Sequence, residues 1–425
     1  MSHFSPVQRG KPRALPAALP RALSSLSFTL LLAWAAPGIG APSDPLHVFA
    51  RLGYFHDDNL FRLAPGQAGF GGRRSDSARY ASAGLLFDKQ RWRQHLKLEG
   101  KLSKVKFSHF DQLDYDGKDF LGLLTWQAGN HWEGKAGASF TQTLAPYTDL
   151  FTSERNLRVH KRAHGDAAWR LHPRWRLRVA AARDRTTYDL PLQRVNNRTE
   201  TAFETGFDHL APSGSTAGVV LRRVRGNYLV ARMAGRASDD FTQDEFKLKV
   251  HWKVTPISSV ELLAGHARRR HREQAQAQGQ GPGQSRGQDD VSGFNGRATA
   301  SLNPRKKLRL NASVWREFAP IESTLVAYSL NRGASVGGSW DASAKVRVDA
   351  DLRSERRSYR ASAPSNALSD VKDTLRQASL GASWTPRPTL QFNAAFSRQQ
   401  RSGTPFLGNG SFKANTFSVS VAGQF

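Results

Sequence analysis

Residues 246–253 read FKLKVHWK and alternate strictly between apolar and polar side chains. Phe246, Leu248, Val250 and Trp252 fall on one face of an extended chain, while the lysines and the histidine between them fall on the other. Alternation with period two is typical of a β-strand that has one apolar and one polar face. A helix would distribute the same lysines around its axis, so this stretch predicts a strand.

The same alternation recurs along most of the chain, with clear examples at residues 174–182, 345–353, 390–397 and 417–425. About 18 such segments can be recognised, and their connections alternate between short and long. The short turns are expected at residues 88–91, 129–130, 172–173, 211–214, 255–256, 303–305, 341–342 and 385–388. The long polar loops are expected near residues 56–76, 108–117, 146–156, 188–197, 227–240, 274–288, 319–325, 360–371 and 402–412.

Two architectures use strands of this kind. A soluble sandwich turns its apolar faces inward, whereas a transmembrane barrel turns them toward lipid and keeps a polar lumen. Regular alternation of short and long connections is typical of outer-membrane barrels, with short turns in the periplasm and long loops outside the cell. The sequence therefore predicts an all-β, antiparallel, up-and-down transmembrane barrel of about 16–18 strands in the bacterial outer membrane.

Tryptophan placement supports the barrel, because indole rings favour the boundary between lipid and water. After the N-terminal segment, every tryptophan except Trp315 lies within a few residues of an expected short turn, which predicts a periplasmic aromatic girdle. Its expected members are Trp92, Trp126, Trp132, Trp169, Trp175, Trp252, Trp340 and Trp384. The last strand, with Val421 and the terminal Phe425, resembles the C-terminal signal read by barrel insertion machinery, which is an expected partner.

Composition narrows the class of protein further. Of 425 residues, 62 are Lys or Arg and 35 are Asp or Glu, which gives a formal net charge of +27, and cysteine is absent. Disulfide scaffolds, thiolate metal sites and cysteine nucleophiles are therefore excluded, and no other pattern predicts a cofactor. A basic stretch, an apolar stretch and small residues predict a secretory signal at residues 1–41, followed by the barrel at 42–425. Because an exported chain meets no genome, the charge does not indicate nucleic-acid binding.

The polar faces of the expected strands carry many cations, which predicts a basic, aqueous lumen. The candidate lining residues are Lys97, Lys101, Arg174, Arg176, Arg178, Arg222, Lys247, Lys249, Arg309, Lys345, Arg347 and Arg353. An alternative interpretation is that such cations form ion pairs inside the lumen or, at the rim, bind phosphates of lipopolysaccharide and other outer-membrane lipids. Arg268, Arg269 and Arg270 fit the second role.

Residues 44–94 contain the pieces DDNLFRL, RSD and GLLFDKQ, which begin at residues 57, 74 and 84. These pieces resemble the EpsL-type outer-membrane proteins of exopolysaccharide gene clusters, which are classed with β-barrel porins. The family-like segment of the first loop consists of Asp57, Asp58, Asn59, Leu60, Phe61 and Arg62. The resemblance implies export of an extracellular polysaccharide, together with other exopolysaccharide synthesis and export proteins as partners. The chain departs from that family in being unusually basic.

Four classes of function follow as hypotheses. The leading one is a non-enzymatic channel that takes part in polysaccharide export, where an anionic polymer would suit the basic lining; the alternative is an anion-preferring diffusion porin. A third is a barrel that anchors adhesive loops, and a fourth is an enzyme. The fourth lacks a defined nucleophile–base spacing, since His56, Asp57 and Asp58 form only a loop cluster. The family-like segment is interpreted either as a loop packed into the pore or docked to a partner, or as a turn held by Asp and Asn side chains.

Overall fold

A computed structural model of the chain describes residues 44–230, 240–271, 291–321, 328–360, 371–403 and 410–425. These residues form eighteen β-strands in a single sheet and two short 3-10 helices, η1 (Asp111–Leu113) and η2 (Pro191–Asn196). The strands are β1 (Leu46–Asp57), β2 (Asp76–Arg91), β3 (Gln94–Phe107), β4 (Tyr115–Ala128), β5 (Trp132–Leu144), β6 (Leu157–His172), β7 (Trp175–Tyr188), β8 (Arg198–Leu210), β9 (Thr216–Tyr228), β10 (Phe241–Thr255), β11 (Ser258–His271), β12 (Val291–Arg305), β13 (Leu308–Pro320), β14 (Tyr328–Asp341), β15 (Val346–Arg360), β16 (Lys372–Arg387), β17 (Leu390–Gly403) and β18 (Phe412–Gln424). No helix in this part of the chain combines the length and the apolar character that a membrane span requires.

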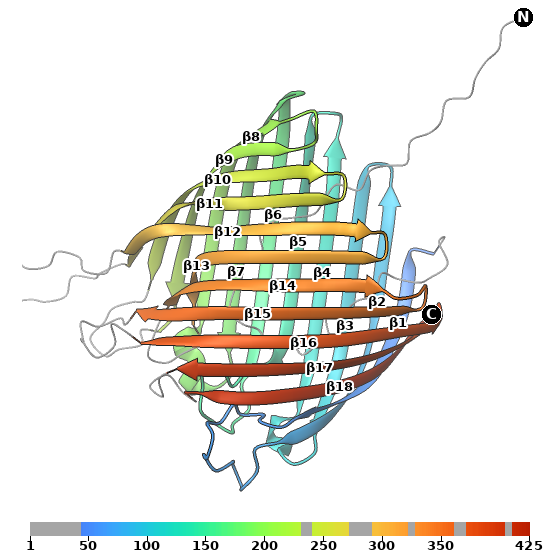
Figure 1. Ribbon diagram of the computed structural model, residues 1–425, viewed down its shortest axis with the longest axis vertical. Helices are drawn as coiled ribbons and strands as arrows, with labels where there is room; N and C mark the ends of the chain where they lie inside the picture. Colours follow the sequence, from blue (N-terminus) through green and yellow to red (C-terminus); the bar gives the residue numbers. More distant parts are fainter. Residues whose placement is uncertain (1–43, 231–239, 272–290, 322–327, 361–370, 404–409) are drawn as a thin grey trace, which may run out of the picture.

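The sheet closes on itself as a barrel (Figure 1). Each strand pairs antiparallel with its neighbours in sequence, and β1 pairs with both β2 and β18. At this junction Leu52 lies opposite Val421, and the backbone N–H and C=O of the terminal Phe425 bond those of Val48 at 2.8 and 2.9 Å. The predicted antiparallel barrel of eighteen strands is therefore confirmed.

Short and long connections alternate around the barrel, as the sequence predicts. The first short turn lies at residues 92–93, beyond the expected 88–91, because β2 and β3 keep pairing as far as Arg91 opposite Gln94. The polar side chains at residues 88–91 do not end the strand, because the backbone hydrogen bonds between β2 and β3 continue regardless of side-chain type. The expected signal at residues 1–41 lies outside the described residues, as does the long loop expected at residues 274–288.

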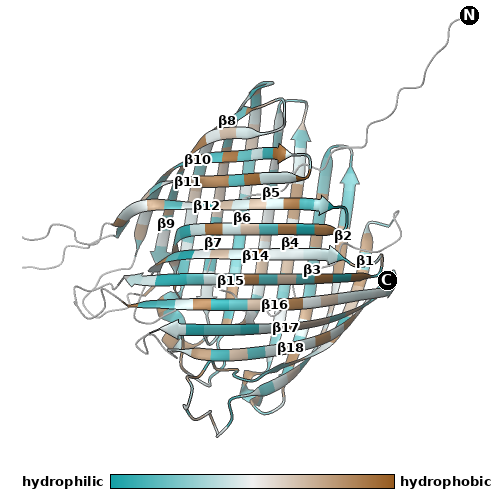
Figure 2. Cartoon of the chain, viewed as in Figure 1, coloured by the Kyte–Doolittle hydropathy of each residue, from teal (hydrophilic) through white to brown (hydrophobic). Residues whose placement is uncertain are grey.

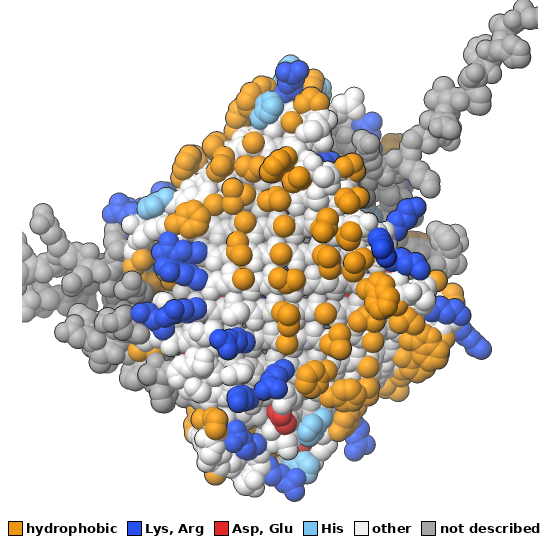
Figure 3. Space-filling model, viewed as in Figure 1, with side chains coloured by type: hydrophobic (Ala, Val, Ile, Leu, Met, Phe, Trp, Pro, Cys, Tyr) orange, Lys and Arg blue, Asp and Glu red, His pale blue; other side chains and the backbone are white. Residues whose placement is uncertain are grey.

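The outer surface of the barrel is apolar across its middle (Figures 2 and 3). On β10, Phe246 and Trp252 are 57% and 55% exposed, whereas Lys247 between them is 6% exposed and faces the interior. In a closed barrel every backbone group can pair between strands, so such a surface can face lipid without unsatisfied hydrogen bonds. The protein is therefore an integral β-barrel of the bacterial outer membrane, with the short turns on the periplasmic side and the long loops outside.

Candidate functional site: the lumen and its external mouth

Alternate residues of each strand point into the barrel and form the lumen wall. Most cations assigned to the lining from the sequence occupy such positions: Lys97 and Lys101 on β3, Arg176 and Arg178 on β7, Arg222 on β9, Lys247 and Lys249 on β10, Arg309 on β13, and Arg347 and Arg353 on β15. Arg174 and Lys345 do not, since they lie in exposed turns before β7 and β15. The alternation of residue types continues past the end of the strand, which is why the pattern alone included them.

Carboxylates on the same inward faces offset these cations. Arg176 contacts both Glu133 and Asp208, at 3.0 and 2.8 Å, and Arg178 contacts Glu204 at 3.1 Å. Further ion pairs of this kind are Lys101–Asp119, Arg162–Asp184, Arg222–Glu245, Lys247–Glu245, Arg297–Glu317, Arg347–Asp341 and Arg353–Glu355. The wall is thus extensively ion-paired, as expected from the alternative interpretation that these cations form ion pairs inside the lumen.

Trp315, the one tryptophan after residue 41 that lies far from a short turn, lies inside the barrel. It is 6% exposed, and its indole N–H donates to Glu355 at 2.8 Å. The guanidinium carbons of Arg297 and Arg353 lie 4.8 and 4.5 Å from the ring, which are cation–π distances. A side chain at Gly333 would meet this ring at 2.3 Å, so the glycine is what lets the indole lie against the wall.

The tryptophans of the expected girdle lie at the periplasmic ends of strands or in a turn. Trp132 and Trp169 stack with ring centroids 5.4 Å apart and planes 3° apart, and both are at least 40% exposed. Trp175, Trp252, Trp340 and Trp384 are 41–55% exposed, Trp126 is half-buried, and Trp92 is 89% exposed in the first turn.

A cavity of about 170 Å³ opens into the lumen beside β6–β13, with Arg162, Asp184 and Glu245 in its wall. Its lining mixes these charged side chains with apolar ones such as Val220 and Phe241. No group of three His, Asp or Glu in the described ranges is placed to hold a metal ion.

The family-like segment forms a buried turn at the external end of β1. Asp57, which is 0% exposed, accepts hydrogen bonds from the Arg62 guanidinium at 2.8 and 2.9 Å and from the Asn59 N–H at 3.0 Å. The Asn59 side chain bonds the N–H and the C=O of Leu63, both at 2.9 Å. Arg62 has a φ of 57°, a conformation that favours glycine, so these bonds hold a strained backbone. Asp58 bonds β18 instead.

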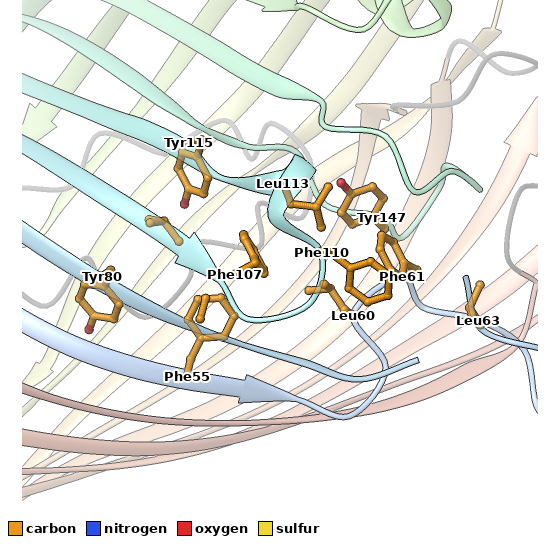
Figure 4. Close-up of a cluster of buried hydrophobic side chains, with 12 residues drawn as sticks. Phe55, Leu60, Phe61, Leu63, Tyr80, Phe107, Phe110, Leu113, Tyr115 and Tyr147 are labelled. Carbon is orange, nitrogen blue, oxygen red and sulfur yellow. The ribbon is translucent and has the colours of Figure 1, made fainter. Parts of the chain in front are cut away.

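Leu60 and Phe61 point from this turn into a cluster of buried side chains at the external mouth (Figure 4). Phe61 is 1% exposed and meets Phe70, Phe110 and Tyr147 edge to face, with ring centroids 4.9, 4.8 and 5.0 Å away. We call this the apolar mouth cluster; its members are Phe55, Leu60, Phe61, Leu63, Ala78, Tyr80, Val105, Phe107, Phe110, Leu113, Tyr115 and Tyr147. Three long loops are joined there. Side chains hold the turn, as one interpretation of the segment predicts, and docking of the loop to a partner stays a prediction.

The β5–β6 loop, residues 145–156, crosses the mouth to the opposite wall. Its Asp149 accepts hydrogen bonds from Arg357 on β15 at 3.1 and 3.2 Å and from Arg401 on β17 at 3.1 Å. Arg401 also donates to the C=O of Thr148 at 2.8 Å. Because β15 and β17 lie far around the closed ring from β5 and β6, these contacts span the lumen.

Four charged side chains meet at that point, and we call them the cross-lumen cluster: Asp149, Arg357, Asp373 and Arg401. Asp373, at the start of β16, contacts Arg357 and Arg401, each at 2.6 Å, and accepts a hydrogen bond from Tyr359. Arg357, Asp373 and Arg401 are 3%, 3% and 1% exposed. Buried pairs of this kind are screened by salt much less than surface pairs. The sequence offered no sign of this cluster, because its members are widely separated along the chain.

The cross-lumen cluster should persist at mildly acidic pH and open only in strong acid. Burial raises the pKa of Asp149, but the charges of Arg357 and Arg401 outweigh it and hold the pKa below the ordinary 3.8. A lowered carboxyl pKa gives stability that is present above the unfolded pKa and lost as pH falls through the folded one. We expect loop closure, read from channel conductance, to stay constant from pH 7 to 5 and to weaken below about pH 4. A transition centred near pH 6 would point to a histidine instead.

No protein-family model matches the chain, and no curated protein is detectably similar to it in sequence. Solved structures of similar architecture include OpdK of Pseudomonas aeruginosa with vanillate, at a TM-score of 0.47 and 11% identity, covering 89% of this chain and 99% of OpdK. OccK2 (OpdF) of the same organism, in complex with glucuronate, has a TM-score of 0.47 and 12% identity, covering 90% and 98%. The FrpB iron transporter of Neisseria meningitidis has a TM-score of 0.47 and 10% identity, covering 90% and 82%.

Proposed function

We propose that this barrel is a diffusion channel for small hydrophilic solutes, preferring anions, with an external mouth narrowed by loop contacts. The observation that carries the proposal is the β5–β6 loop, which Asp149 ties across the lumen to Arg357 and Arg401. A lumen crossed in this way suits ions and small molecules better than a wide polymer. The formal net charge of +27 stays strongly positive without the four basic residues of the expected signal, and it supports a preference for anions because a positive potential raises their local concentration. The barrel itself would catalyse no reaction.

Single-channel recording of the mature chain in a planar bilayer, under a KCl gradient, tests this function. We expect stable conductance steps, a reversal potential displaced toward that of chloride, and no interruption of the current by an acidic oligosaccharide. Selectivity for potassium would refute the anion preference. A correctly folded barrel without conductance would refute the channel and favour a barrel that only anchors its loops.

Export of an extracellular polysaccharide is a second candidate, which the first loop supports. The residues that resemble EpsL-type proteins, Asp57 to Arg62, are those that build the turn behind the apolar mouth cluster. In this function the mouth would open only when synthesis and export proteins deliver the polymer. Conductance steps that an acidic oligosaccharide interrupts, once Asp149→Asn has loosened the β5–β6 loop, would favour export over diffusion of small solutes.

A further inference from the structure

Five arginines face outward near the external ends of five neighbouring strands. We call them the arginine row: Arg316 on β13, Arg332 on β14, Arg356 on β15, Arg376 on β16 and Arg398 on β17. Their outward direction follows from the strand alternation, since each shares its face with exposed apolar residues of the same strand. Figure 3 shows Lys and Arg side chains gathered over the ends of these strands, on the side of the long loops.

The register places like charges directly opposite each other. Arg332 lies between Arg316 on one neighbouring strand and Arg356 on the other. Arg376 lies opposite Ser354, and Arg398 opposite Ala378, so both are within two residues of the same level on adjacent strands. Side chains directly opposite in an antiparallel pair have Cβ atoms about 4.5–5.5 Å apart, and like charges there destabilise the sheet.

No carboxylate in the described part of the chain forms an ion pair with any member of the arginine row. Some outward cations elsewhere on the barrel do have such partners. Asp244 contacts Arg223 at 2.5 Å and Arg270 at 2.6 Å, and Lys106 contacts Asp114 at 2.6 Å. The row thus places five arginines on five adjacent strands without a carboxylate partner among the described residues, so an external anion would stabilise it.

Apolar side chains begin directly below the row, toward the periplasm. They are Val314, Val336, Leu352, Leu380 and Phe396, which are 45–60% exposed. Each is two to four residues from the arginine of its strand, or about 7–14 Å at 3.4 Å per residue. This spacing matches an amphiphile with an anionic head group at the level of the arginines and acyl chains against the apolar band.

We propose that the arginine row binds phosphorylated head groups of the outer leaflet, of the lipid A class. Guanidinium groups bind phosphate through paired, charge-assisted hydrogen bonds, which suits several arginines at one level. A soluble anion would neutralise the charge but leave the apolar surface below unused. The proposal concerns the lipid-facing surface and is independent of what passes through the lumen.

Lipid binding to the purified full barrel in detergent tests the proposal. The variant is Arg316→Gln/Arg332→Gln/Arg356→Gln, and the matched control is Lys104→Gln/Lys106→Gln, which removes outward cations that have carboxylate partners. We expect wild type and control to bind lipid A at least tenfold more tightly than the triple variant, and all three to bind dephosphorylated lipid A alike. Equal binding of lipid A by wild type and triple variant would overturn the site. Binding of inorganic phosphate as tight as that of lipid A would overturn its assignment to a lipid.

Thermal unfolding of the single variant Arg332→Gln gives a second test that does not depend on the triple variant folding. Without lipid the variant should unfold at a higher temperature than wild type, because the arginine between two others is removed. With lipid A the order should reverse, since only wild type keeps the full row. The proposal would be contradicted if Arg332→Gln unfolded at a lower temperature than wild type without lipid. It would also be contradicted if lipid A raised the unfolding temperature of the variant as much as that of wild type.

Discussion

Replacing Asp149 by asparagine should open the external mouth and raise the ratio of open to closed channels by about 100-fold. The carboxylate receives hydrogen bonds from two buried guanidinium groups, those of Arg357 and Arg401. Hydrogen bonds to charged groups contribute about 1.5–3 kcal/mol each, and an amide would retain part of them. A net loss of about 3 kcal/mol corresponds to two orders of magnitude in an open–closed equilibrium. Single-channel recording at neutral pH measures the open probability directly.

Glu154→Gln is the matched control, because Glu154 lies in the same loop but is exposed and uses only its backbone in the described contacts. It should behave as wild type. Arg401→Gln should also open the mouth, but it leaves Asp373 and Asp149 to share Arg357 and so lowers stability as well. If Asp149→Asn and Glu154→Gln both kept the wild-type open probability, the β5–β6 loop would not control the channel.

The barrel could be predicted because its information is local. Each strand carries its own alternation, as in residues 246–253, and the side chain period of two assigns the faces without knowledge of the partner strand. The alternation predicts turn boundaries less accurately, since it places Arg174 and Lys345 on strands although both lie in turns. Pairing decides where a strand ends, and the alternation of side chains does not stop there.

The mouth could not be predicted, because its contacts are not local. Asp149 and Arg401 are 252 positions apart, and nothing in either neighbourhood indicates the other. The arginine row was missed for a different reason. Outward positions are apolar only at the depth of the hydrocarbon. Arg316 and Arg332 interrupt that pattern because they lie at the level where lipid head groups begin, so the pattern alone does not indicate their role.

Phe61→Ala should lower the free energy of unfolding by about 3–5 kcal/mol and leave the external mouth permanently more open. The ring is 1% exposed and contacts Phe70, Phe110 and Tyr147, so its removal leaves a cavity among three loops that cannot all close around it. Urea unfolding of the barrel in detergent measures the stability, and channel conductance measures the opening.

Phe151→Ala provides the comparison, because Phe151 contacts Phe70 at the edge of the same region but is 48% exposed. Phe151→Ala should lower the free energy of unfolding by less than about 1 kcal/mol, since little apolar surface is lost from the interior. The two readouts separate the role of the apolar mouth cluster from that of the cross-lumen cluster. Phe61→Ala should change stability and conductance together, whereas Asp149→Asn should act mainly on conductance because Arg357 and Arg401 keep Asp373 as a partner. A Phe61→Ala barrel of wild-type conductance but reduced stability would mean that the cluster supports the loops without narrowing the path.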